Sequence, residues 1–176
     1  MADTDLAAEV HHSGGSYPVV AGWGLIDSLG DRFTDLGLVN TAYIITDANV
    51  MNLYGRNVQR ALQKRNIPAH CFIVPAGETS KSFELAQAIY IWLAELKAER
   101  GHTIISVGGG VAGDLGGFIA ATYLRGMPFV QVPTSMAAMV DASIGGKVAI
   151  NLPHAKNLVG AFYQPKGVFA DVRTLS

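Results

Sequence analysis

Short runs of β-branched and apolar residues alternate along this chain with longer segments in which apolar residues recur at helical spacing. The short runs predict strands at residues 17–20, 42–46, 70–74, 103–107, 129–132 and 168–171. The longer segments predict helices at residues 25–36, 49–65 and 82–100, with a further helix after Gly113. Strands that alternate with helices of these lengths indicate an α/β fold, with a parallel sheet and helices on both faces.

The N-terminal part departs from this alternation. Residues 1–16 are polar and interrupted by glycine, so we expect a flexible N-terminus, followed by one domain over residues 17–176. The run at residues 17–20 contains Pro18, which has no backbone N–H to donate to a neighbouring strand and is disfavoured in a central strand. We therefore expect an edge strand there.

Composition and charge narrow the class of protein. With 176 residues, 49% of them hydrophobic, the chain is long enough to bury a core. A net charge of -1 and 15% charged residues provide no basic face, so we expect no nucleic-acid partner. No apolar run approaches the roughly 20 residues that span a bilayer, and no basic signal-peptide start is present. We expect a cytoplasmic protein without a membrane partner, in which the single Cys71 is an inert, buried thiol.

The stretch at residues 103–114 carries the strongest candidate chemistry. Its β-branched run ends at glycines, and Gly108, Gly110 and Gly113 have the spacing G-x-G-x-x-G. Bare backbone at a helix N-terminus suits a phosphate or pyrophosphate, although glycines also form ordinary strand-to-helix corners. The dinucleotide version of this motif has an acid about 20 residues later, where this chain has Pro133 and Thr134. If a nucleotide binds here, an acidic residue from another part of the chain must hold its ribose, and Asp47 is a candidate.

Other polar residues follow predicted strands or lie in apolar surroundings. The loop after residues 70–74 contains Glu78 and Lys81, and ligands bind at the carboxyl ends of parallel strands. Each of these residues has a plainer interpretation as a helix cap or a loop charge. Further along, Asp141, Lys147 and Asn151 lie among small and apolar residues, where charges need partners or a ligand. The Gly-Gly-Lys ending at Lys147 is not an ATPase loop, because the preceding glycine and the following hydroxyl are missing.

Six ordered motifs together resemble a known family. They are Gly77-Glu78-x-x-Lys81, Gly108-Gly109-Gly110-Val111-x-Gly113-Asp114, Tyr123-x-Arg125-Gly126, Gln131-Val132-Pro133-Thr134, Val140-Asp141-x-Ser143-x-Gly145-Gly146-Lys147 and Lys156-Asn157-x-x-Gly160-Ala161-Phe162-Tyr163-Gln164-Pro165. From about Tyr17 to its last residue, the chain resembles the N-terminal, NAD-binding domain of the 3-dehydroquinate synthase family. The resemblance implies a Rossmann-like α/β fold.

The resemblance also implies a reaction. The family converts 3-deoxy-D-arabino-heptulosonate 7-phosphate to 3-dehydroquinate and phosphate, in the shikimate pathway of aromatic amino acid and chorismate biosynthesis. Its NAD oxidises the C5 hydroxyl, phosphate is eliminated, the hydride returns, and ring opening and aldol closure follow. The family is a lyase that uses NAD and zinc or cobalt and works as a homodimer.

The roles that the resemblance implies fall into three groups. The residues expected to bind NAD are Asp47, Asn49, Glu78, Lys81, Gly109, Gly110, Val111, Asp114, Thr134, Ser135, Asp141, Lys147 and Lys156. Lys147, Asn157 and Asp141 are expected to be catalytic. Arg125, Asp141, Lys147 and Asn157 are expected to bind substrate, with Arg125 lent to the phosphate in the partner subunit.

Several features depart from the family pattern. Ser135 stands where the family usually has Thr, a tolerable exchange of one hydroxyl for another. Ala142 and Val148 stand where the family usually has Ser and Thr, and each lost hydrogen bond would weaken cofactor binding by about 1 kcal/mol. The family's metal ligands, one Glu and two His, belong to a following helical domain, so no metal site is expected in this chain. We therefore expect a cofactor-binding part that is inactive alone. The alternatives are another sugar-phosphate cyclase, such as a 2-deoxy-scyllo-inosose or valiolone synthase, or a stand-alone NAD-binding module.

Overall fold

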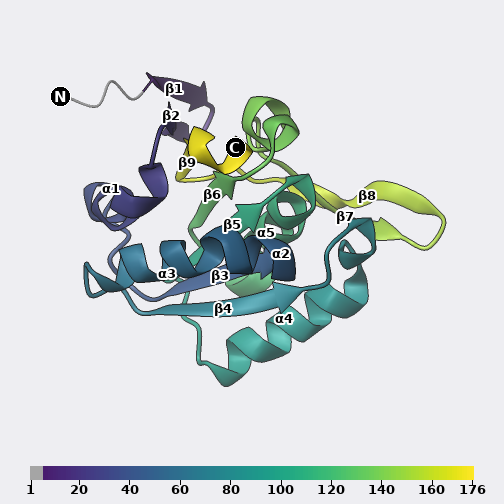
Figure 1. Ribbon diagram of the computed structural model, residues 1–176. Helices are drawn as coiled ribbons and strands as arrows, with labels where there is room; N and C mark the ends of the chain where they lie inside the picture. Colours follow the sequence, from purple (N-terminus) through teal and green to yellow (C-terminus); the bar gives the residue numbers. More distant parts are fainter. Residues whose placement is uncertain (1–5) are drawn as a thin grey trace.

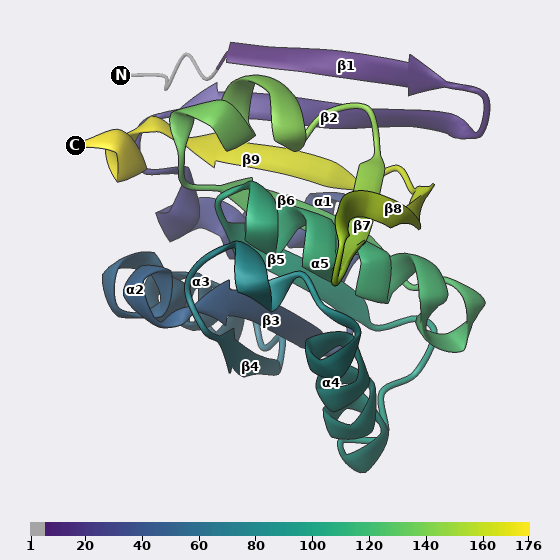
Figure 2. The same ribbon diagram turned by 90° about the vertical axis from the view of Figure 1, so that its right-hand side faces the viewer.

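The computed structural model describes residues 6–176. Seven strands form one sheet in the order β1-β2-β9-β6-β5-β3-β4, from the top of Figure 2 towards its lower part. All neighbours are parallel except β1 and β2. The strands are β1 Leu6–His12, β2 Gly15–Gly22, β3 Ala42–Asp47, β4 Ala69–Val74, β5 Thr103–Gly108, β6 Phe129–Pro133 and β9 Gly167–Asp171. Every residue of β5, β6 and β9 is buried, as expected for parallel strands covered on both faces.

Helices cover both faces of this sheet (Figure 1). One core contains apolar residues of α1 (Leu29–Asp35) and α3 (Arg56–Gln63), packed on Ile44 and Ile105 of the sheet. The other contains residues of α4 (Phe83–Glu95) and α5 (Gly110–Thr122), packed on Ile45 and Ile104. Adjacent strand residues therefore enter opposite cores, as the period of two requires. The predicted α/β fold class is confirmed.

The N-terminal strands differ from the prediction. Residues 6–12 form β1, which pairs antiparallel with β2, so β1 and not β2 lies at the edge of the sheet. Pro18 is tolerated inside the sheet because β2 begins its pairing with β9 at Val19, one residue later. Of the residues 1–16 expected to be flexible, residues 6–12 and 15–16 thus lie in paired strands, while residues 1–5 lie outside the described part of the chain.

Two predicted helices have different ends or geometry. The segment predicted as one helix over residues 49–65 begins with the short α2 (Ala48–Val50), continues as a π-helical turn over Met51–Gly55 and ends with α3. The helix predicted to reach residue 100 ends at Glu95, because Lys97 adopts a left-handed φ of 54°. The Ala98 N–H then donates to the Leu93 carbonyl at 2.9 Å, which closes the helix C-terminus.

A two-stranded hairpin of β7 (Lys147–Leu152) and β8 (Ala155–Phe162) lies outside the main sheet, on the α5 side (Figure 1). The sequence did not predict it and assigned residues 160–165 to a turn. Val148 fixes the hairpin on α5, since a Cβ on Gly117 would lie 2.2 Å from its Cγ1. A π-helical turn, Ala138–Ala142, precedes the hairpin.

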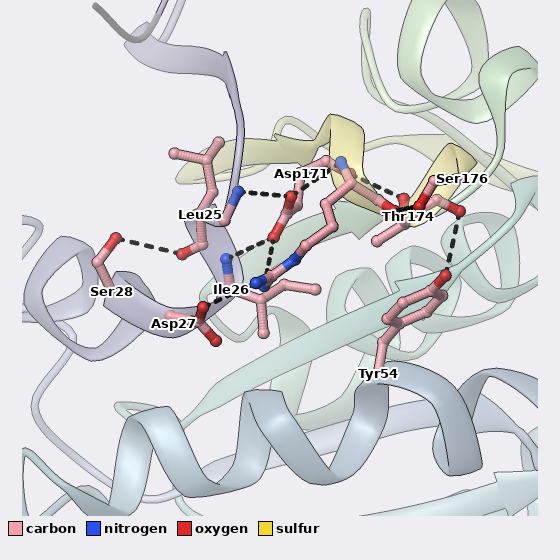
Figure 3. Close-up of polar contacts among 10 residues, drawn as sticks. Leu25, Ile26, Asp27, Ser28, Tyr54, Asp171, Thr174 and Ser176 are labelled. Atoms are coloured by element: carbon pink, nitrogen blue, oxygen red, sulfur yellow. Dashed lines mark hydrogen bonds and ion pairs between the residues drawn. The ribbon is translucent and has the colours of Figure 1, made fainter. Parts of the chain in front are cut away.

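The end of β9 is bound to the segment that follows β2 (Figure 3). Asp171 is fully buried and accepts hydrogen bonds from the backbone N–H groups of Gly24 at 2.8 Å and Ile26 at 3.1 Å. Arg173 forms ion pairs with Asp171 at 3.2 Å and with Asp27 at 2.9 Å. The ion pair with Arg173 lowers the pKa of Asp27.

No helix within residues 6–176 is long and apolar enough to cross a membrane.

Candidate functional site

The predicted site residues follow the carboxyl ends of neighbouring strands. Asp47 ends β3, Glu78 and Lys81 follow β4, Gly109 follows β5 and Thr134 follows β6. These four strands are adjacent and parallel, so their carboxyl ends share one edge of the sheet. Residues up to 87 positions apart in the sequence, the separation of Asp47 and Thr134 (134 minus 47), are thereby placed along the same edge.

The glycine turn joins β5 to α5 in fewer residues than the sequence predicted. β5 ends at Gly108 and α5 begins at Gly110, rather than after Gly113. Gly108 has a φ of 153°, and a Cβ there would lie 2.8 Å from the Cβ of Ala112. The turn is therefore too tight for any other residue at Gly108. It is anchored to the next strand by the Thr134 N–H, which donates to the Gly108 carbonyl at 2.9 Å.

The N-terminus of α5 presents backbone donors. Its first helical hydrogen bond runs from the Gly113 N–H to the Gly109 carbonyl at 3.1 Å, so the N–H groups of Gly110, Val111 and Ala112 have no partner within the helix. Among the described residues, no side chain caps this terminus. Ser135 lies beside it, with Oγ 3.4 Å from the position of a Cβ on Gly109. Uncapped amides at the positive end of a 13-residue helix favour an anion.

A cavity of about 160 Å³ adjoins these amides. It is lined by Asp47, Val74, Pro75, Gly77, Gly109, Gly110, Val111 and Ala112. Asp47 Oδ1 caps α2 by accepting from the N–H groups of Asn49 at 2.8 Å and Val50 at 3.0 Å. The carboxylate is thus held at the rim by its own backbone, while the exposed Asn49 follows it in α2. The capping role and a role towards a ligand are compatible, because a carboxylate has two oxygens.

Lys81 is the centre of a buried polar cluster. Its side chain is only 4% exposed, and Nζ lies 2.6 Å from Oδ2 of Asp114 and 3.5 Å from Oε1 of Glu78. It also donates a short hydrogen bond to Oδ1 of Asn157. A buried ammonium is costly unless it is paired and hydrogen-bonded. Three partners from three elements satisfy that requirement, so Lys81 is not a solvated loop charge.

The two carboxylates of this cluster have opposite pKa shifts. Burial raises the pKa of Asp114, and the hydrogen bond and charge of Lys81 oppose that rise. The hydrogen bond from Asn151 lowers the pKa of Glu78, assisted by the charges of Lys81 and Lys156. Glu78 is therefore held in its ionised form, whereas Asp114 retains its proton to a higher pH than a solvated aspartic acid.

The residues predicted to be catalytic share a second cavity, of about 480 Å³. Asp141 from the π-helical turn, Lys147 from β7 and Asn157 from β8 all line it, together with Asp114. Asp114 thus touches Lys81 with one oxygen and borders this cavity as well. Lys156 is exposed and lines a third cavity, of about 680 Å³, between the hairpin and the start of α4.

Arg125 lies apart from these cavities. It follows the C-terminal end of α5, and a 13-residue helix places it about 20 Å from the glycine turn. Leu124, Arg125 and Gly126 have consecutive positive φ angles of 50°, 64° and 123°. The exposed Arg125 is thus presented on a tight loop away from the other predicted site residues of its own chain.

The departures at positions 142 and 148 lie in different surroundings. Val148 is 2% exposed and packs in the core against α5, so a hydroxyl there would enter the core. Ala142 lines the 480 Å³ cavity, and its Cβ lies 3.5 Å from the position of a Cβ on Gly110. A hydroxyl missing at Ala142 is therefore the one that bears on the glycine turn.

Asn151 is the residue to which the sequence assigned no role. In the sequence it stands out only as a polar residue in apolar surroundings, because its contacts depend on an irregularity of the hairpin that the pattern does not reveal. Metal ligands are a separate question: within residues 6–176, no group of three His, Cys, Asp or Glu side chains is placed to hold a metal ion.

The sheet, the glycine turn and the Lys81 cluster define an α/β domain that presents backbone donors and a buried charge cluster at one edge of a parallel sheet. The family model described as 3-dehydroquinate synthase N-terminal matches residues 71–176. The 3-dehydroquinate synthase of Symbiobacterium thermophilum is 49% identical over 160 residues, which cover 90% of this chain and 45% of that protein. This chain belongs to the 3-dehydroquinate synthase family, and it spans less than half the length of that curated relative.

Solved structures share the fold. A 2-deoxy-scyllo-inosose synthase complexed with carbaglucose-6-phosphate, NAD⁺ and Co²⁺ matches with a TM-score of 0.89 and 27% identity, over 96% of this chain and 46% of that chain. The 2-epi-5-epi-valiolone synthase ValA of Streptomyces hygroscopicus subsp. jinggangensis, with NAD⁺ and Zn²⁺ bound, matches with a TM-score of 0.81 and 28% identity, over 97% of this chain and 46% of that chain. These relatives bind NAD⁺ and a divalent metal.

Proposed function

We propose that this chain is the NAD-binding part of a 3-dehydroquinate synthase, which converts 3-deoxy-D-arabino-heptulosonate 7-phosphate to 3-dehydroquinate and phosphate. The observation that carries the proposal is the uncapped N-terminus of α5 beside the 160 Å³ cavity. A pyrophosphate fits there because the tight glycine turn leaves the backbone N–H groups of Gly110 and Val111 accessible to it. NAD, when bound, supplies a hydride acceptor that becomes the donor later in the same turnover.

The residues around the turn have complementary roles in this proposal. Asp47 accepts hydrogen bonds from the ribose hydroxyls at the cavity rim, with Asn49 beside it. Gly109, Gly110, Val111, Thr134 and Ser135 form the cradle of the pyrophosphate. Lys81 bonds both Glu78, which lines the 680 Å³ cavity, and Asp114, which lines the 480 Å³ cavity, so this cluster fixes the wall between those two cavities.

The 480 Å³ cavity would receive the substrate and the nicotinamide. Lys147 and Lys156 supply positive charge on the hairpin, which suits a phosphorylated sugar acid. Asn157 and Asp141 provide hydrogen-bonding groups for its hydroxyls and move or hold protons there. Asp114, with its raised pKa, is able to hold a proton beside this cavity.

Two parts of the proposed reaction require residues beyond this cluster. The metal, zinc or cobalt, does not fit the described residues, so it would be held by the part of the relatives' length that this chain does not span. Arg125 would serve a substrate phosphate bound by a second subunit of a homodimer. We therefore expect the chain alone to show no turnover.

A second candidate is another sugar-phosphate cyclase, since the inosose synthase shares the fold with a TM-score of 0.89. Its identity to this chain is 27%, against 49% for the dehydroquinate synthase of S. thermophilum. A stand-alone NAD-binding module is the alternative from another class. It predicts the same binding of NAD but no gain of activity when the remaining part of a dehydroquinate synthase is supplied.

Calorimetric titration of NAD into this chain tests the proposal. We expect binding to weaken by at least about tenfold, or about 1.4 kcal/mol, in Lys81→Ala and Asp114→Ala. Matched controls are Lys64→Ala and Glu95→Ala, exposed charges at the C-terminal ends of α3 and α4, which should bind as the unaltered chain does. NADP should bind more weakly than NAD, because Asp47 repels a 2′-phosphate. Failure of the folded chain to bind NAD contradicts the proposal.

A further inference from the structure

The hairpin that carries Lys147 and Asn157 is irregular at one place. β7 and β8 pair regularly from Lys147 with Phe162 to Ile150 with Val159, and next at Leu152 with Ala155. Between the last two pairs, β7 has one residue, Asn151, while β8 has three, residues 156–158. β8 therefore bulges at the point where the candidate site residues lie.

Asn157 occupies the centre of this bulge in a left-handed conformation, with a φ of 59°. Side chains other than glycine rarely adopt this conformation, and asparagine does so more readily than most. The bulge also interrupts the ladder, so the backbone N–H of Asn157 needs a partner outside it. That partner is the side chain of Asn151, whose Oδ1 accepts from it at 2.9 Å.

Asn151 makes two further bonds to the loop after β4. Its side-chain Nδ2 donates to Oε1 of Glu78 at 2.8 Å, and its backbone N–H donates to the Lys81 carbonyl at 2.8 Å. One residue thus ties together the bulge, an ionised carboxylate and the backbone that carries the buried ammonium. The amide is suited to this task because it donates with one end and accepts with the other.

We propose that Asn151 is a positioning residue of the NAD site, which holds the bulge of β8 so that Asn157 reaches Lys81 and which keeps Glu78 oriented toward the same ammonium. The inference rests on the proposed function for the identity of the ligand, but not for the role of Asn151 within the cluster. Asn151 lines the 680 Å³ cavity on the far side of Lys81 rather than the 480 Å³ cavity, so it acts through its neighbours.

Asn151→Asp separates its two side-chain bonds. The aspartate retains an oxygen that accepts from the Asn157 N–H, but it loses the donor to Glu78 and places two carboxylates within hydrogen-bond distance of each other. Two carboxylates that share a site raise each other's proton affinity. Asn151→Ala removes both bonds. Asn40→Ala is a matched control, because Asn40 donates one side-chain hydrogen bond to the Gly101 carbonyl, and both residues lie before the amino ends of their strands, β3 and β5.

Side-chain carboxyl NMR titration of Glu78 is the first measurement, and it requires no cofactor. We expect Glu78 to titrate at higher pH in Asn151→Asp and in Asn151→Ala than in the unaltered chain, and to be unchanged in Asn40→Ala. In the unaltered chain, the side-chain amide protons of Asn151 should shift with the same midpoint as Glu78, which tests the contact even where a variant fails to fold. An unchanged Glu78 titration in a folded Asn151→Asp would overturn the inference. So would side-chain amide protons of Asn151 whose chemical shifts do not change as Glu78 titrates.

Calorimetric titration of NAD then separates this inference from the proposed function. We expect Asn151→Asp to bind NAD about tenfold more weakly at neutral pH, with affinity recovering as the carboxylate pair takes up a proton. Asn151→Ala should bind more weakly at every pH. A uniform loss in both variants without pH dependence would contradict the positioning role. If the unaltered chain fails to bind NAD, the proposed function fails, while the Glu78 titration still decides the role of Asn151.

Discussion

The ammonium of Lys81 lies 2.6 Å from the carboxylate of Asp114, although Lys81 follows β4 and Asp114 lies in the second turn of α5. This ion pair joins the loop after an outer strand of the sheet to the helix that begins at the glycine turn. Lys81 is 4% exposed and the Asp114 side chain 23%, so the pair is mostly shielded from water. Without Lys81, Asp114 would lose its ion-pair partner, whereas Lys81 without Asp114 would keep only Glu78 and Asn157 as partners.

Removing the ammonium should make stability depend on pH. Burial raises the pKa of Asp114 in the folded state. The stabilisation of the folded state by the protonated Asp114 is therefore present at low pH and is lost as pH rises through the folded pKa. In Lys81→Met this pKa rises further, because the opposing charge is gone while the apolar stem is kept. We expect a loss of about 2 to 4 kcal/mol near neutral pH that shrinks on acidification.

Urea unfolding at a series of pH values measures this effect. Lys64→Met, at an exposed position, is the control and should follow the unaltered chain. A loss that is the same at acidic and neutral pH would show that Asp114 does not respond to Lys81.

The hairpin should depend on the absence of a side chain at Gly117. A Cβ there would lie 2.2 Å from Cγ1 of Val148, so Gly117→Ala must displace β7 or α5. We expect a destabilisation of about 1 to 3 kcal/mol, measured by thermal or urea unfolding. Val148→Ala should relieve the overlap, so the double variant should lose less stability than the sum of the two single variants. Additive losses would place Val148 away from Gly117.

The buried carboxylate of Asp171 should be important for stability. It accepts from the Gly24, Ile26 and Arg173 backbone N–H groups and pairs with the Arg173 guanidinium, so Asp171→Ala leaves three donors and a cation without their acceptor. We expect a loss of about 3 kcal/mol in unfolding free energy. Asp27→Asn, which alters the exposed side of the same ion-pair group, should cost about 1 kcal/mol or less. Equal losses in the two variants would contradict the structural role of Asp171.

A hydroxyl introduced at position 142 should affect NAD affinity, whereas one introduced at position 148 should affect stability. Ala142→Ser places a hydroxyl near Gly110, and we expect it to tighten NAD binding by up to about tenfold without loss of stability. Val148→Thr buries a hydroxyl in the core, and we expect it to cost about 1 to 3 kcal/mol of stability with unchanged NAD affinity. Calorimetry and unfolding of the two variants measure both quantities. Tighter binding in Val148→Thr would contradict the placement of β7.

The sequence predicted the main sheet because β3, β4, β5, β6 and β9 are short apolar runs separated by helical patterns or glycine turns. It did not predict β8, since Ala155–Phe162 contains exposed polar and apolar residues on both sides of a bulge and has no regular alternation. It also placed Pro18 at an edge, because nothing in the local pattern reveals that β1 covers that side of β2.

The candidate site was predictable where residues follow strand ends. Asp47, Glu78 and Gly109 needed only the rule that parallel strands end at one edge of the sheet. The contact of Lys81 with Asn157 spans 76 residues and depends on the bulge, so spacing could not reveal it. The start of α5 at Gly110 was missed because glycine is a poor helix former. Within this helix, however, contacts with Gln131 and Val148 leave no room for a side chain at Gly113 and Gly117.

Mapping of amide chemical shifts during titration with NAD tests the central claim most directly. We predict that the largest shift changes occur at the N–H groups of Gly109, Gly110 and Val111, with smaller ones at Asp47 and Asp114. In Lys81→Ala, all of these shift changes should require a higher concentration of NAD. The contradictory result is binding that perturbs other residues while the amides at the start of α5 remain unchanged. In that event the glycine turn would be a structural corner and the cofactor site would lie elsewhere.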